Sequence, residues 1–399
     1  MLSKINTNYC KLNTKLQKTL TKLKRNAHTS NSVNSDEVVR ILVIRYKFIG
    51  DVMLTSVLCN TLKQTFPNAK VDYLIHDTSE ALFGDHPFIN RVFALSAQQR
   101  KNPFSYFRAV GKVAARGYDL IVDAQSTQKS EFVSMLSNKR AIRIGRYKKR
   151  RGLFYTHKVS VDSSAGHKIE ERIRLLQPLT DMGIELKQSR DMAVAVPQVL
   201  KANFKQRMKN AGIDFTRPVF VFAVTAKLQY KKWRTDQIAE VAEHCLRCFD
   251  AQIVLNYGSE SELEDVQGFH AKMQQNANIF TSLHTDNLMQ LAALISHCQL
   301  YIGNEGGPRH IAHAVGVPSV SVFSPSAKKA EWLPSNSRAH QGVEWDDLLD
   351  KTKQEKAAIH AELVIGSEQY LDLYNMITAQ PVIELVDDVA DFVGIARVN

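Results

Sequence analysis

The sequence lacks any apolar run long enough to cross a membrane, which takes roughly 20 consecutive apolar residues. Its first residues also lack the apolar core of a secretory signal, so we expect a chain that is not exported and stays in the cytoplasm. Cysteine is scarce as well. The five cysteines are scattered along the chain: Cys10, Cys59, Cys245, Cys248 and Cys298. A small, odd number of this kind is typical of a reducing compartment and predicts free thiols.

What is present is the composition of an ordinary globular protein. Hydrophobic residues make up 44% and charged residues 23% of the chain, which argues against a disordered or fibrous protein. A length of 399 residues exceeds what one ordinary core supports and predicts two or three domains.

The net charge of +12 is concentrated in an N-terminal tail. Residues 1–30 hold seven of the 52 basic residues and no acid, so the rest of the chain carries 45 basic against 40 acidic residues, or +5. Apolar residues recur in the tail at helical steps of three and four: Leu2, Ile5, Tyr9, Leu12, Leu16, Leu20 and Leu23. The pattern predicts a basic amphipathic helix lying on an anionic membrane. A frayed tail, a coiled-coil contact and a mitochondrial targeting peptide are the alternatives.

From residue 39 the sequence alternates short β-branched runs with longer helical patterns. The first series opens with a strand over 38–44 and a helix over 51–64, and it closes with a long helix over 168–177. After Pro197 the rhythm restarts with a strand over 219–224. Such alternation predicts parallel sheets covered on both faces, and hence an α/β protein with two doubly wound, Rossmann-like domains facing a central cleft.

We therefore expect four parts. They are a basic tail and linker over 1–38, an N-terminal α/β domain over 39–190, a C-terminal α/β domain over 191–345 and a helical tail over 346–399 that packs back across both domains. In each domain ligands are expected at the carboxyl ends of the strands.

The first motif is the junction of the first strand and helix, Ile44-Arg45-Tyr46-Lys47-Phe48-Ile49-Gly50-Asp51. Gly50 permits a tight turn, and Asp51 is predicted at the helix start above the carboxyl edge of the sheet. Position alone favours an N-cap, because an aspartate there accepts the first free N–H groups. A cap and a catalytic base do not exclude each other.

The second motif runs from Tyr301 to Pro318 and places a glycine pair, Gly306-Gly307, between a strand and a helix that opens on Pro308. Free N–H groups at such a helix start form an anion site suited to a diphosphate. The loop matches neither the Walker pattern nor G-x-G-x-x-G, so its shape alone is weak evidence.

The two motifs together resemble glycosyltransferase family 9, the lipopolysaccharide heptosyltransferases. The family's Gly-Asp turn is matched by residues 50–55, and its donor-domain segment by 304–318. Its Lys-x-Trp is similar to Lys231-Lys232-Trp233, and the segment before its interdomain helix to residues 167–170. The resemblance covers roughly residues 39–330 and leaves out the N-terminal tail and the last 60 or so residues.

The resemblance implies a GT-B fold and an inverting transfer from a nucleotide-activated sugar, usually ADP-heptose, onto the lipopolysaccharide inner core. Asp51 is then the base that deprotonates the acceptor hydroxyl. The implied donor-binding residues are Thr225, Lys231, Glu262, Glu305, Gly306, Gly307 and His310. Among these, Lys231, Thr225 and the glycine pair bind the diphosphate and Glu262 the ribose. Glu305 binds the sugar, and His310 supports the loop.

No resident cofactor is implied, and no metal. A metal that bridges the diphosphate is commonly held by a D-x-D triplet, which the sequence lacks. The leaving group would be stabilised instead by Lys231 and the helix dipole.

A basic run over 139–151 is interpreted as an acceptor site. Its candidate residues are Arg143, Arg146, Lys149 and Arg150. Arginine forks suit the phosphates and carboxylates of an anionic lipid-linked core oligosaccharide; a solvated charge patch is the alternative. A nucleic-acid partner is not expected, because no aromatic platform interleaves the run. With the basic tail, this run predicts an enzyme peripheral to the inner face of the inner membrane.

The sequence departs from the family pattern where Glu305-Gly306 replaces an Asp-(Ser/Thr) pair, and Arg309 beside it is a further candidate phosphate contact. The replacement removes a hydroxyl and lengthens the carboxylate arm next to the donor sugar. Another nucleotide-sugar donor, a protein acceptor, an epimerase and a non-catalytic nucleotide-binding scaffold remain alternatives. Cys245-Leu246-Arg247-Cys248 is interpreted as core thiols and not as zinc ligands, since a second such pair is absent. His313 is expected to be a packed helix residue.

Overall fold

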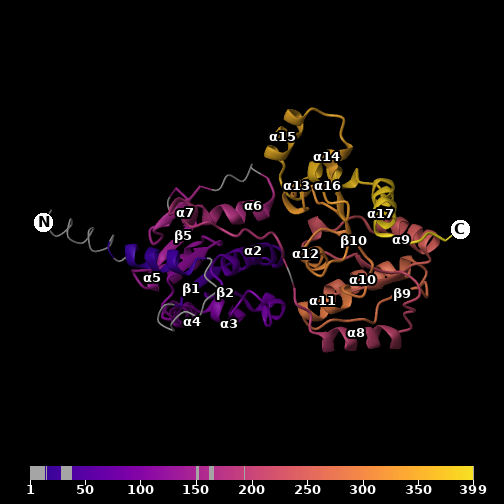
Figure 1. Ribbon diagram of the computed structural model, residues 1–399. Helices are drawn as coiled ribbons and strands as arrows, with labels where there is room; N and C mark the ends of the chain where they lie inside the picture. Colours follow the sequence, from indigo (N-terminus) through magenta and orange to yellow (C-terminus); the bar gives the residue numbers. More distant parts are fainter. Residues whose placement is uncertain are drawn as a thin grey trace. The chain divides into compact units, whose positions relative to one another are not determined.

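The computed structural model describes Thr14 and residues 16–27, 38–149, 152–160, 166–192 and 194–398. The chain divides into two compact units, Met1–Ala195 and Val196–Asn399 (Figure 1). Residues 346–398, which the sequence set apart as a tail across both domains, belong to the second unit.

Unit 1 is built on a six-stranded parallel sheet in the order β3-β2-β1-β4-β5-β6. The strands are β1 (Arg40–Ile44), β2 (Lys70–His76), β3 (Arg91–Leu95), β4 (Leu120–Asp123), β5 (Ile142–Arg146) and β6 (His157–Val159). The helices are α2 (Ile49–Thr65), η1 (Asp77–Phe83), α3 (Ala97–Lys101), α4 (Pro103–Ala114), α5 (Gln128–Leu136), α6 (Lys168–Ile173), η2 (Arg174–Leu176) and α7 (Gln177–Asp181). The long helix expected over 168–177 is thus three short segments, since Pro178 opens a new helical turn at α7.

The strands of unit 1 are apolar because helices cover both faces of the sheet. In β1, Ile41 to Ile44 are fully buried. Helices α4 and α5 cover one face, where α4 turns Tyr106, Val110 and Val113 inward at helical spacing. Helices α2 and α6 pack together in the same unit.

A short N-terminal helix over residues 16–26 packs on unit 1. The Leu23 side chain is fully buried, the Thr19 hydroxyl donates to the Arg140 carbonyl at 2.9 Å, and Lys22 forms an ion pair with Asp119 at 2.9 Å. The sequence assigned Leu23 to a lipid-facing stripe, and for this residue the prediction is wrong because its side chain is buried in the protein core. Residues 1–13, with the rest of the stripe's N-terminal half, lie outside the described residues.

Unit 2 repeats the same topology, with the parallel sheet order β12-β11-β10-β7-β8-β9. The strands are β7 (Val219–Ala223), β8 (Gln252–Leu255), β9 (Ile279–Phe280), β10 (Leu300–Asn304), β11 (Ser319–Val322) and β12 (His340–Val343). The helices are α8 (Gln198–Asn210), η3 (Gln229–Lys231), α9 (Thr235–Phe249), α10 (Glu260–Lys272), α11 (Leu288–Ile295), α12 (Gly307–Ala314), α13 (Lys329–Trp332), α14 (Trp345–Leu348), α15 (Lys353–Glu362), α16 (Glu368–Asn375) and α17 (Ala379–Val393).

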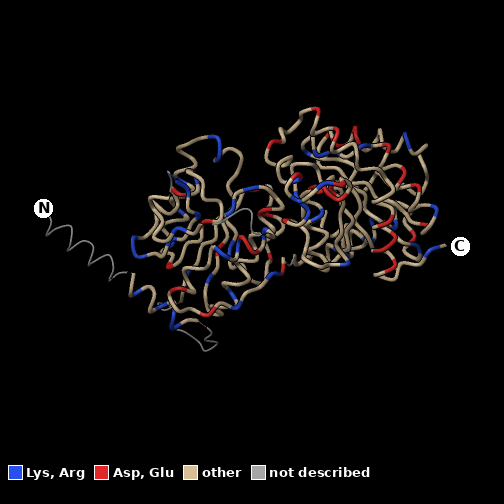
Figure 2. Tube along the Cα trace, turned by 90° about the horizontal axis from the view of Figure 1, so that it is seen from above, with Lys and Arg blue, Asp and Glu red and all other residues tan. Residues whose placement is uncertain are grey.

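The last helix, α17, completes the core of unit 2. Its Val382, Val386 and Val389 are fully buried in the same cluster as residues of α9 and β7. Acidic positions recur along the chain near its C-terminus (Figure 2). One of them, Asp387, binds His244 of α9 at 2.7 Å. The C-terminal segment is therefore a structural part of the second unit.

Candidate functional site

Each sheet has one position where its strand order reverses, between β1 and β4 in unit 1 and between β7 and β10 in unit 2. In open parallel sheets, loops diverge at this point and leave room for a ligand at the carboxyl ends of the strands. Predicted site residues follow three of these four strands: Asp51 comes after β1, Thr225 and Lys231 after β7, and Glu305 after β10. The fold thus supplies one candidate site in each unit.

In unit 1, Asp51 lies in the first turn of α2 and is held by two arginines. Arg45 and Arg172 each place a guanidinium nitrogen 2.7 Å from Oδ1 of Asp51. The helix N-cap is Phe48, two residues before the turn predicted from sequence, so the interpretation of Asp51 as the N-cap is wrong. Among the residues that the structure describes, none donates to Oδ2 of Asp51. This oxygen is the one available to a ligand.

Arg172, one of the two arginines that hold Asp51, is itself fixed by its neighbours. Arg172 is 2% exposed and also binds Glu171 at 2.8 Å. Burial, together with the neighbouring Arg45, lowers the pKa of Arg172 to about 10, which still leaves it charged at neutral pH. Burial alone would raise the pKa of Glu171, but Arg172, Arg146 and Lys168 hold it below its ordinary value. The cluster therefore holds the Asp51 side chain in a fixed orientation at the start of α2.

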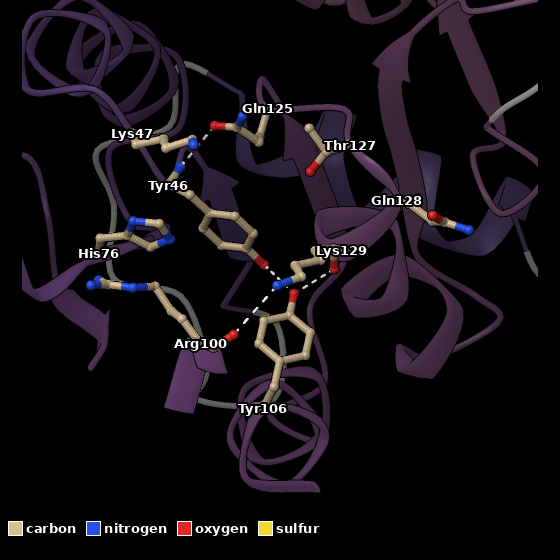
Figure 3. A pocket seen from close by; sticks show the side chains of 9 residues that line it. All are labelled: Tyr46, Lys47, His76, Arg100, Tyr106, Gln125, Thr127, Gln128 and Lys129. Carbon is tan, nitrogen blue, oxygen red and sulfur yellow. Dashed lines mark hydrogen bonds between the residues drawn. The ribbon is translucent and has the colours of Figure 1, made fainter. Parts of the chain in front are cut away.

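A pocket of about 520 Å³ opens at the same sheet edge (Figure 3). Nine residues line it: Tyr46, Lys47, His76, Arg100, Tyr106, Gln125, Thr127, Gln128 and Lys129. Tyr46 follows β1, His76 ends β2, and Gln125 follows β4, so the switch point of the sheet forms the pocket floor. The hydroxyls of Tyr46 and Tyr106 are 2.9 Å apart, and Gln125 accepts from the Tyr46 N–H at 3.1 Å.

The pocket is cationic. None of its nine lining residues is acidic, whereas Lys47, Arg100 and Lys129 are basic. Arg100 is paired with Asp77, whereas Lys129 donates to the Arg100 carbonyl and has no ion pair among the described residues. Burial lowers the pKa of His76 to about 4, so the imidazole is neutral near pH 7 and stacks on the Tyr46 ring. The arrangement suits a ligand with sugar hydroxyls and one or two negative charges.

The predicted acceptor residues of the basic run lie apart from this pocket's lining. Arg143 donates to the carbonyls of Phe154 and Asn138, and Arg146 forms an ion pair with Glu171. Lys149 is exposed, and Arg150 lies outside the described residues. Arg143 and Arg146 thus make contacts within unit 1 that organise the run itself.

In unit 2, Asn304 joins the two loops at the switch point. Its side chain donates to the Thr225 carbonyl at 3.1 Å and accepts from the Trp233 N–H at 2.8 Å. The preceding Gly303 has φ +126, and a Cβ there would lie 2.6 Å from the Ala223 carbonyl oxygen, so no other residue fits between β10 and β7. The loops that hold Thr225, Lys231 and Glu305 are therefore fixed to one another.

Lys231 and Glu305 meet directly, with Nζ 2.6 Å from Oε1. Ser324 also donates to Glu305 at 3.3 Å. Helix α12 begins beside them at Gly307, with Gly306 as its N-cap at φ +154 and Pro308 in its first turn. A lysine next to free helix N–H groups is an arrangement that binds a diphosphate.

The remaining residues predicted to bind the donor lie partly at the surface of unit 2 and partly in its interior. Glu262 accepts from the Gly258 N–H at 2.7 Å at the end of β8 and is half-buried. His310 is buried, and its ring contacts Trp332. Arg309 is 1% exposed and donates to the Trp332 carbonyl at 3.0 Å. Its proposed phosphate contact is therefore not supported, since the guanidinium lies in the protein interior.

The C-terminal helices brace the lysine loop. Tyr370 donates to the Tyr230 carbonyl and Tyr374 to the Lys231 carbonyl, both at 3.0 Å. Trp233 donates to the Ile377 carbonyl at 2.8 Å. Sequence reasoning left the role of residues 346–399 open. Here α16 and the segment after it position the main chain of η3.

Sequence reasoning also missed most of the pocket in unit 1 and both arginines around Asp51. Arg45 stands in the first motif and could have been noted as the last polar residue before the turn. Arg172 is 121 residues from Asp51, and no local pattern connects them. One sequence feature could have indicated the pocket: several of its residues directly follow the ends of predicted strands.

Two features are absent from the described part of the chain. No helix there is long and apolar enough to cross a membrane. Within the same residues, no three His, Cys, Asp or Glu side chains gather in a group that could hold a metal ion. Cys245 is buried in α9, and Cys248 lies 3.7 Å from the His244 ring.

Comparison with known proteins identifies a family. Residues 106–358 match the model of glycosyltransferase family 9 (heptosyltransferase), which is more than half of the chain. Lipopolysaccharide heptosyltransferase 3 of Escherichia coli (strain K12) is 25% identical over 345 residues, covering 82% of this chain and 96% of that protein. Lipopolysaccharide heptosyltransferase 1 of Campylobacter coli is 22% identical and is covered over 86% of its length, against 73% of this chain.

Solved structures agree on the fold. A glycosyl transferase family 9 protein from Veillonella parvula DSM 2008 superposes with a TM-score of 0.71 at 19% identity, over 90% of this chain and 99% of that one. The E. coli ADP-heptose lps heptosyltransferase II gives a TM-score of 0.64 at 20% identity, over 88% and 98%. The two-domain α/β fold of GT-B type predicted from the sequence is confirmed.

Proposed function

Because this chain belongs to glycosyltransferase family 9, we propose that it is an inverting heptosyltransferase that moves heptose from ADP-heptose onto the lipopolysaccharide inner core. The observation that carries the proposal is the setting of Asp51. Its carboxylate stands at the switch point of the unit 1 sheet, and two arginines on Oδ1 leave Oδ2 available. A fixed carboxylate at the same sheet edge as a cationic pocket suits the deprotonation of an acceptor hydroxyl.

In the proposed step, the acceptor hydroxyl loses its proton to Oδ2 of Asp51 as its oxygen forms a bond to the anomeric carbon of the donor. The bond from that carbon to the diphosphate breaks, and the electron pair leaves with ADP. Attack from the side opposite the leaving group inverts the anomeric carbon. Arg45 and Arg172 orient the Asp51 carboxylate before the transfer.

On the donor side, Lys231 and the N–H groups at the start of α12 receive the diphosphate, assisted by Thr225. The diphosphate takes over the place of Glu305 beside Lys231, since one ammonium cannot serve both at full strength. Glu305 is then available for the hydroxyls of the sugar, and Glu262 for those of the ribose. The charge that develops on ADP is carried by these groups in the proposal, with no metal ion and no resident cofactor.

On the acceptor side, the unit 1 pocket receives an acidic or phosphorylated sugar of the lipid-linked core. Lys47 and Lys129 supply positive charge, and Tyr46 and Gln125 supply hydrogen bonds at its floor. The basic run with Arg143, Arg146, Lys149 and Arg150 remains a proposed second contact for acceptor phosphates. Within the basic tail over residues 1–30, the lysines other than the paired Lys22 are proposed to hold the enzyme on the cytoplasmic face of the inner membrane, where anionic lipids attract lysines. No nucleic-acid partner is proposed.

The test is a donor panel assayed by release of free nucleotide, with purified heptose-free core lipid as acceptor. ADP-heptose, ADP-glucose, UDP-glucose and UDP-N-acetylglucosamine are compared, each with and without acceptor. We expect acceptor-dependent release of ADP from ADP-heptose alone, and mass spectrometry of the lipid should show the added heptose.

Acceptor-dependent release from another nucleotide sugar, with none from ADP-heptose, would contradict the proposed donor. Release that does not depend on the core lipid would contradict the proposed acceptor. The Asp51→Asn protein serves as the matched control for non-enzymatic hydrolysis of the donor.

A further inference from the structure

The segment between β3 and β4 carries an unusual combination of charge and exposed aromatics. Residues 97–118 contain five basic and no acidic residues. Two of the five, Arg100 and Arg116, pair with Asp77 and Asp72. The other three, Lys101, Arg108 and Lys112, are exposed and have no ion pair in the described part of the chain.

The same segment exposes large apolar side chains. Phe104 is 77% and Phe107 40% exposed on α4. Phe107 packs edge-to-face on Phe132 of α5, with ring centroids 4.8 Å apart. Met135 and Leu136 follow on the next turn of α5 and are 38% and 43% exposed. Because residues three and four apart share a helix face, these side chains form one row across α4 and α5.

A loop from elsewhere in the chain extends this row. The buried carboxylate of Glu131, on α5, accepts from the N–H groups of Gly152 and Phe154, both at 3.1 Å. Between these two contacts stands Leu153, which is 83% exposed. An inward-facing acid thus holds an outward-facing leucine beside α5.

We propose that this surface, the α4–α5 face, inserts its apolar side chains into an anionic lipid bilayer. Contiguous exposed aromatics are uncommon on a free globular surface and mark a binding site. A rim of unpaired lysines and arginine around them matches the headgroups of an anionic leaflet, where each basic residue is attracted and the phenylalanines reach the acyl boundary. The charge complementarity favours a bilayer over a second copy of this chain, because the same face on a partner would oppose its own cations.

The helices of the α4–α5 face also line the unit 1 pocket, so a ligand held in the bilayer would lie close to that pocket. Tyr106 of α4 and Lys129 of α5 line the unit 1 pocket, and the ring centroids of Tyr106 and Phe107 are 5.9 Å apart. The two helices that enter the bilayer therefore also build the proposed acceptor site. This link rests on the proposed function, because it assumes that the acceptor is a lipid held in the bilayer.

The experiment compares the full chain with the double variant Phe104→Ser/Leu153→Ser. Both side chains are largely exposed, so the substitutions leave the core intact. The matched control is Val199→Ser/Val364→Ser in unit 2, where the side chains are 74% and 67% exposed. Binding to vesicles of phosphatidylcholine and phosphatidylglycerol is measured by co-sedimentation. We expect the first variant to bind at least about tenfold more weakly, equivalent to ~1.4 kcal/mol, and the control to bind as the parent does.

A direct readout uses Phe104→Trp, since the three natural tryptophans all lie in unit 2. Brominated lipid in the vesicles should quench the new fluorescence at position 104 and leave that of a Val199→Trp protein unchanged. Equal vesicle binding by the parent and Phe104→Ser/Leu153→Ser overturns the proposal, and so does an unquenched tryptophan at position 104. A parent dimer that this variant converts to a monomer, without any vesicle binding, assigns the face to a second copy and also overturns it.

The outcome is separable from that of the proposed function. Transfer to a soluble, delipidated acceptor tests the chemistry alone, and there the double variant should match the parent. A parent that binds vesicles through this face but releases no ADP leaves the membrane inference standing and removes the heptosyltransferase assignment.

Discussion

The Lys231 ammonium lies 2.6 Å from the Glu305 carboxylate at the start of α12. Both residues are on the list of donor contacts predicted from sequence, and they are 74 residues apart in the chain. An ion pair at this position means that Lys231, the lysine proposed to bind the diphosphate, already has an anionic partner. A diphosphate must therefore compete with Glu305 for the same ammonium. We expect Lys231 to strengthen donor binding and Glu305 to weaken it.

Lys231→Ala should weaken binding of both ADP and the nucleotide sugar by roughly 10- to 100-fold, the worth of a charge-assisted hydrogen bond. Turnover should fall as well, because the leaving group loses its cation. Calorimetric titration with ADP and steady-state kinetics measure the two effects. Lys209→Ala, on the exposed part of α8, is the control and should leave both unchanged.

Glu305→Gln should separate phosphate binding from sugar binding. The substitution removes the competing charge, so ADP should bind as tightly as before or more tightly. Turnover of the nucleotide sugar should fall if the carboxylate contacts the sugar hydroxyls. A loss of ADP affinity in this variant would mean that Glu305 organises the lysine loop and does not compete with the ligand.

Asp51→Asn should lower turnover by about 10²- to 10⁴-fold, the usual contribution of a positioned general base. Donor affinity should hardly change, because all of the proposed donor contacts belong to unit 2. The asparagine oxygen can still accept from Arg45 and Arg172, so the arginine cluster should survive, and a thermal melt checks this. Near-normal turnover would leave Asp51 as a structural partner of the two arginines.

The sequence was sufficient for the fold because strand and helix periodicities are local. The strand expected over 219–224 agrees with β7 to within one residue. Strand β3 and helices α4 and α5 were missed, although α4 does place its buried residues at helical spacing. The motif residues of unit 2 lie together at its switch point, where chain order alone places them.

The surroundings of Asp51 could not be predicted in the same way. Its two arginines come from the end of β1 and from α6, and only tertiary packing brings Arg172 to the carboxylate. Similarly, the basic run looked like a free acceptor site in the sequence, yet Arg146 pairs with Glu171, which is 25 residues away. Charge patterns in a sequence show where cations are, but not which of them already have partners.

A chelator should leave the activity unchanged, since the proposed leaving-group contacts are Lys231 and the N–H groups of α12. The donor assay is run after dialysis against EDTA, with magnesium returned in a parallel sample. Activity lost on dialysis and restored by magnesium would require a metal in the transfer step. The Lys231→Ala protein should remain impaired at every magnesium concentration.

Glu344 should make the stability of unit 2 depend on pH. Burial raises its pKa to about 7, whereas an unfolded glutamate titrates near pH 4.3. Between these values the folded chain holds a proton that the unfolded chain has released, so stability falls as pH rises from about 4 to 7. Urea unfolding at pH 5 and pH 7.5 should show a loss of up to ~3 kcal/mol that Glu344→Gln removes. Parallel pH dependence in the two proteins would show that Glu344 is ionised throughout.

The helix over residues 16–26 should stabilise unit 1 as well as carry charge. Leu23 is fully buried and Lys22 pairs with Asp119, so neither side chain is free for a membrane. Leu23→Ala should reduce the free energy of unfolding of unit 1 by about 2 kcal/mol, at the low end for a buried leucine because the helix packs at the edge of the unit. Exposed Lys18→Ala should change it by less than about 0.5 kcal/mol.

Hydrogen exchange of unit 1 peptides in the full chain measures this effect without interference from unit 2. Vesicle binding is measured on the same proteins. If the tail acts on the membrane through its first half, replacing Lys4, Lys11 and Lys15 by glutamine should weaken vesicle binding, each lysine being worth up to ~1 kcal/mol. The same change should leave unfolding unaltered, whereas Leu23→Ala should do the reverse. A Leu23→Ala protein that is as stable as its parent but releases from vesicles would mean that the helix leaves unit 1 in order to bind lipid.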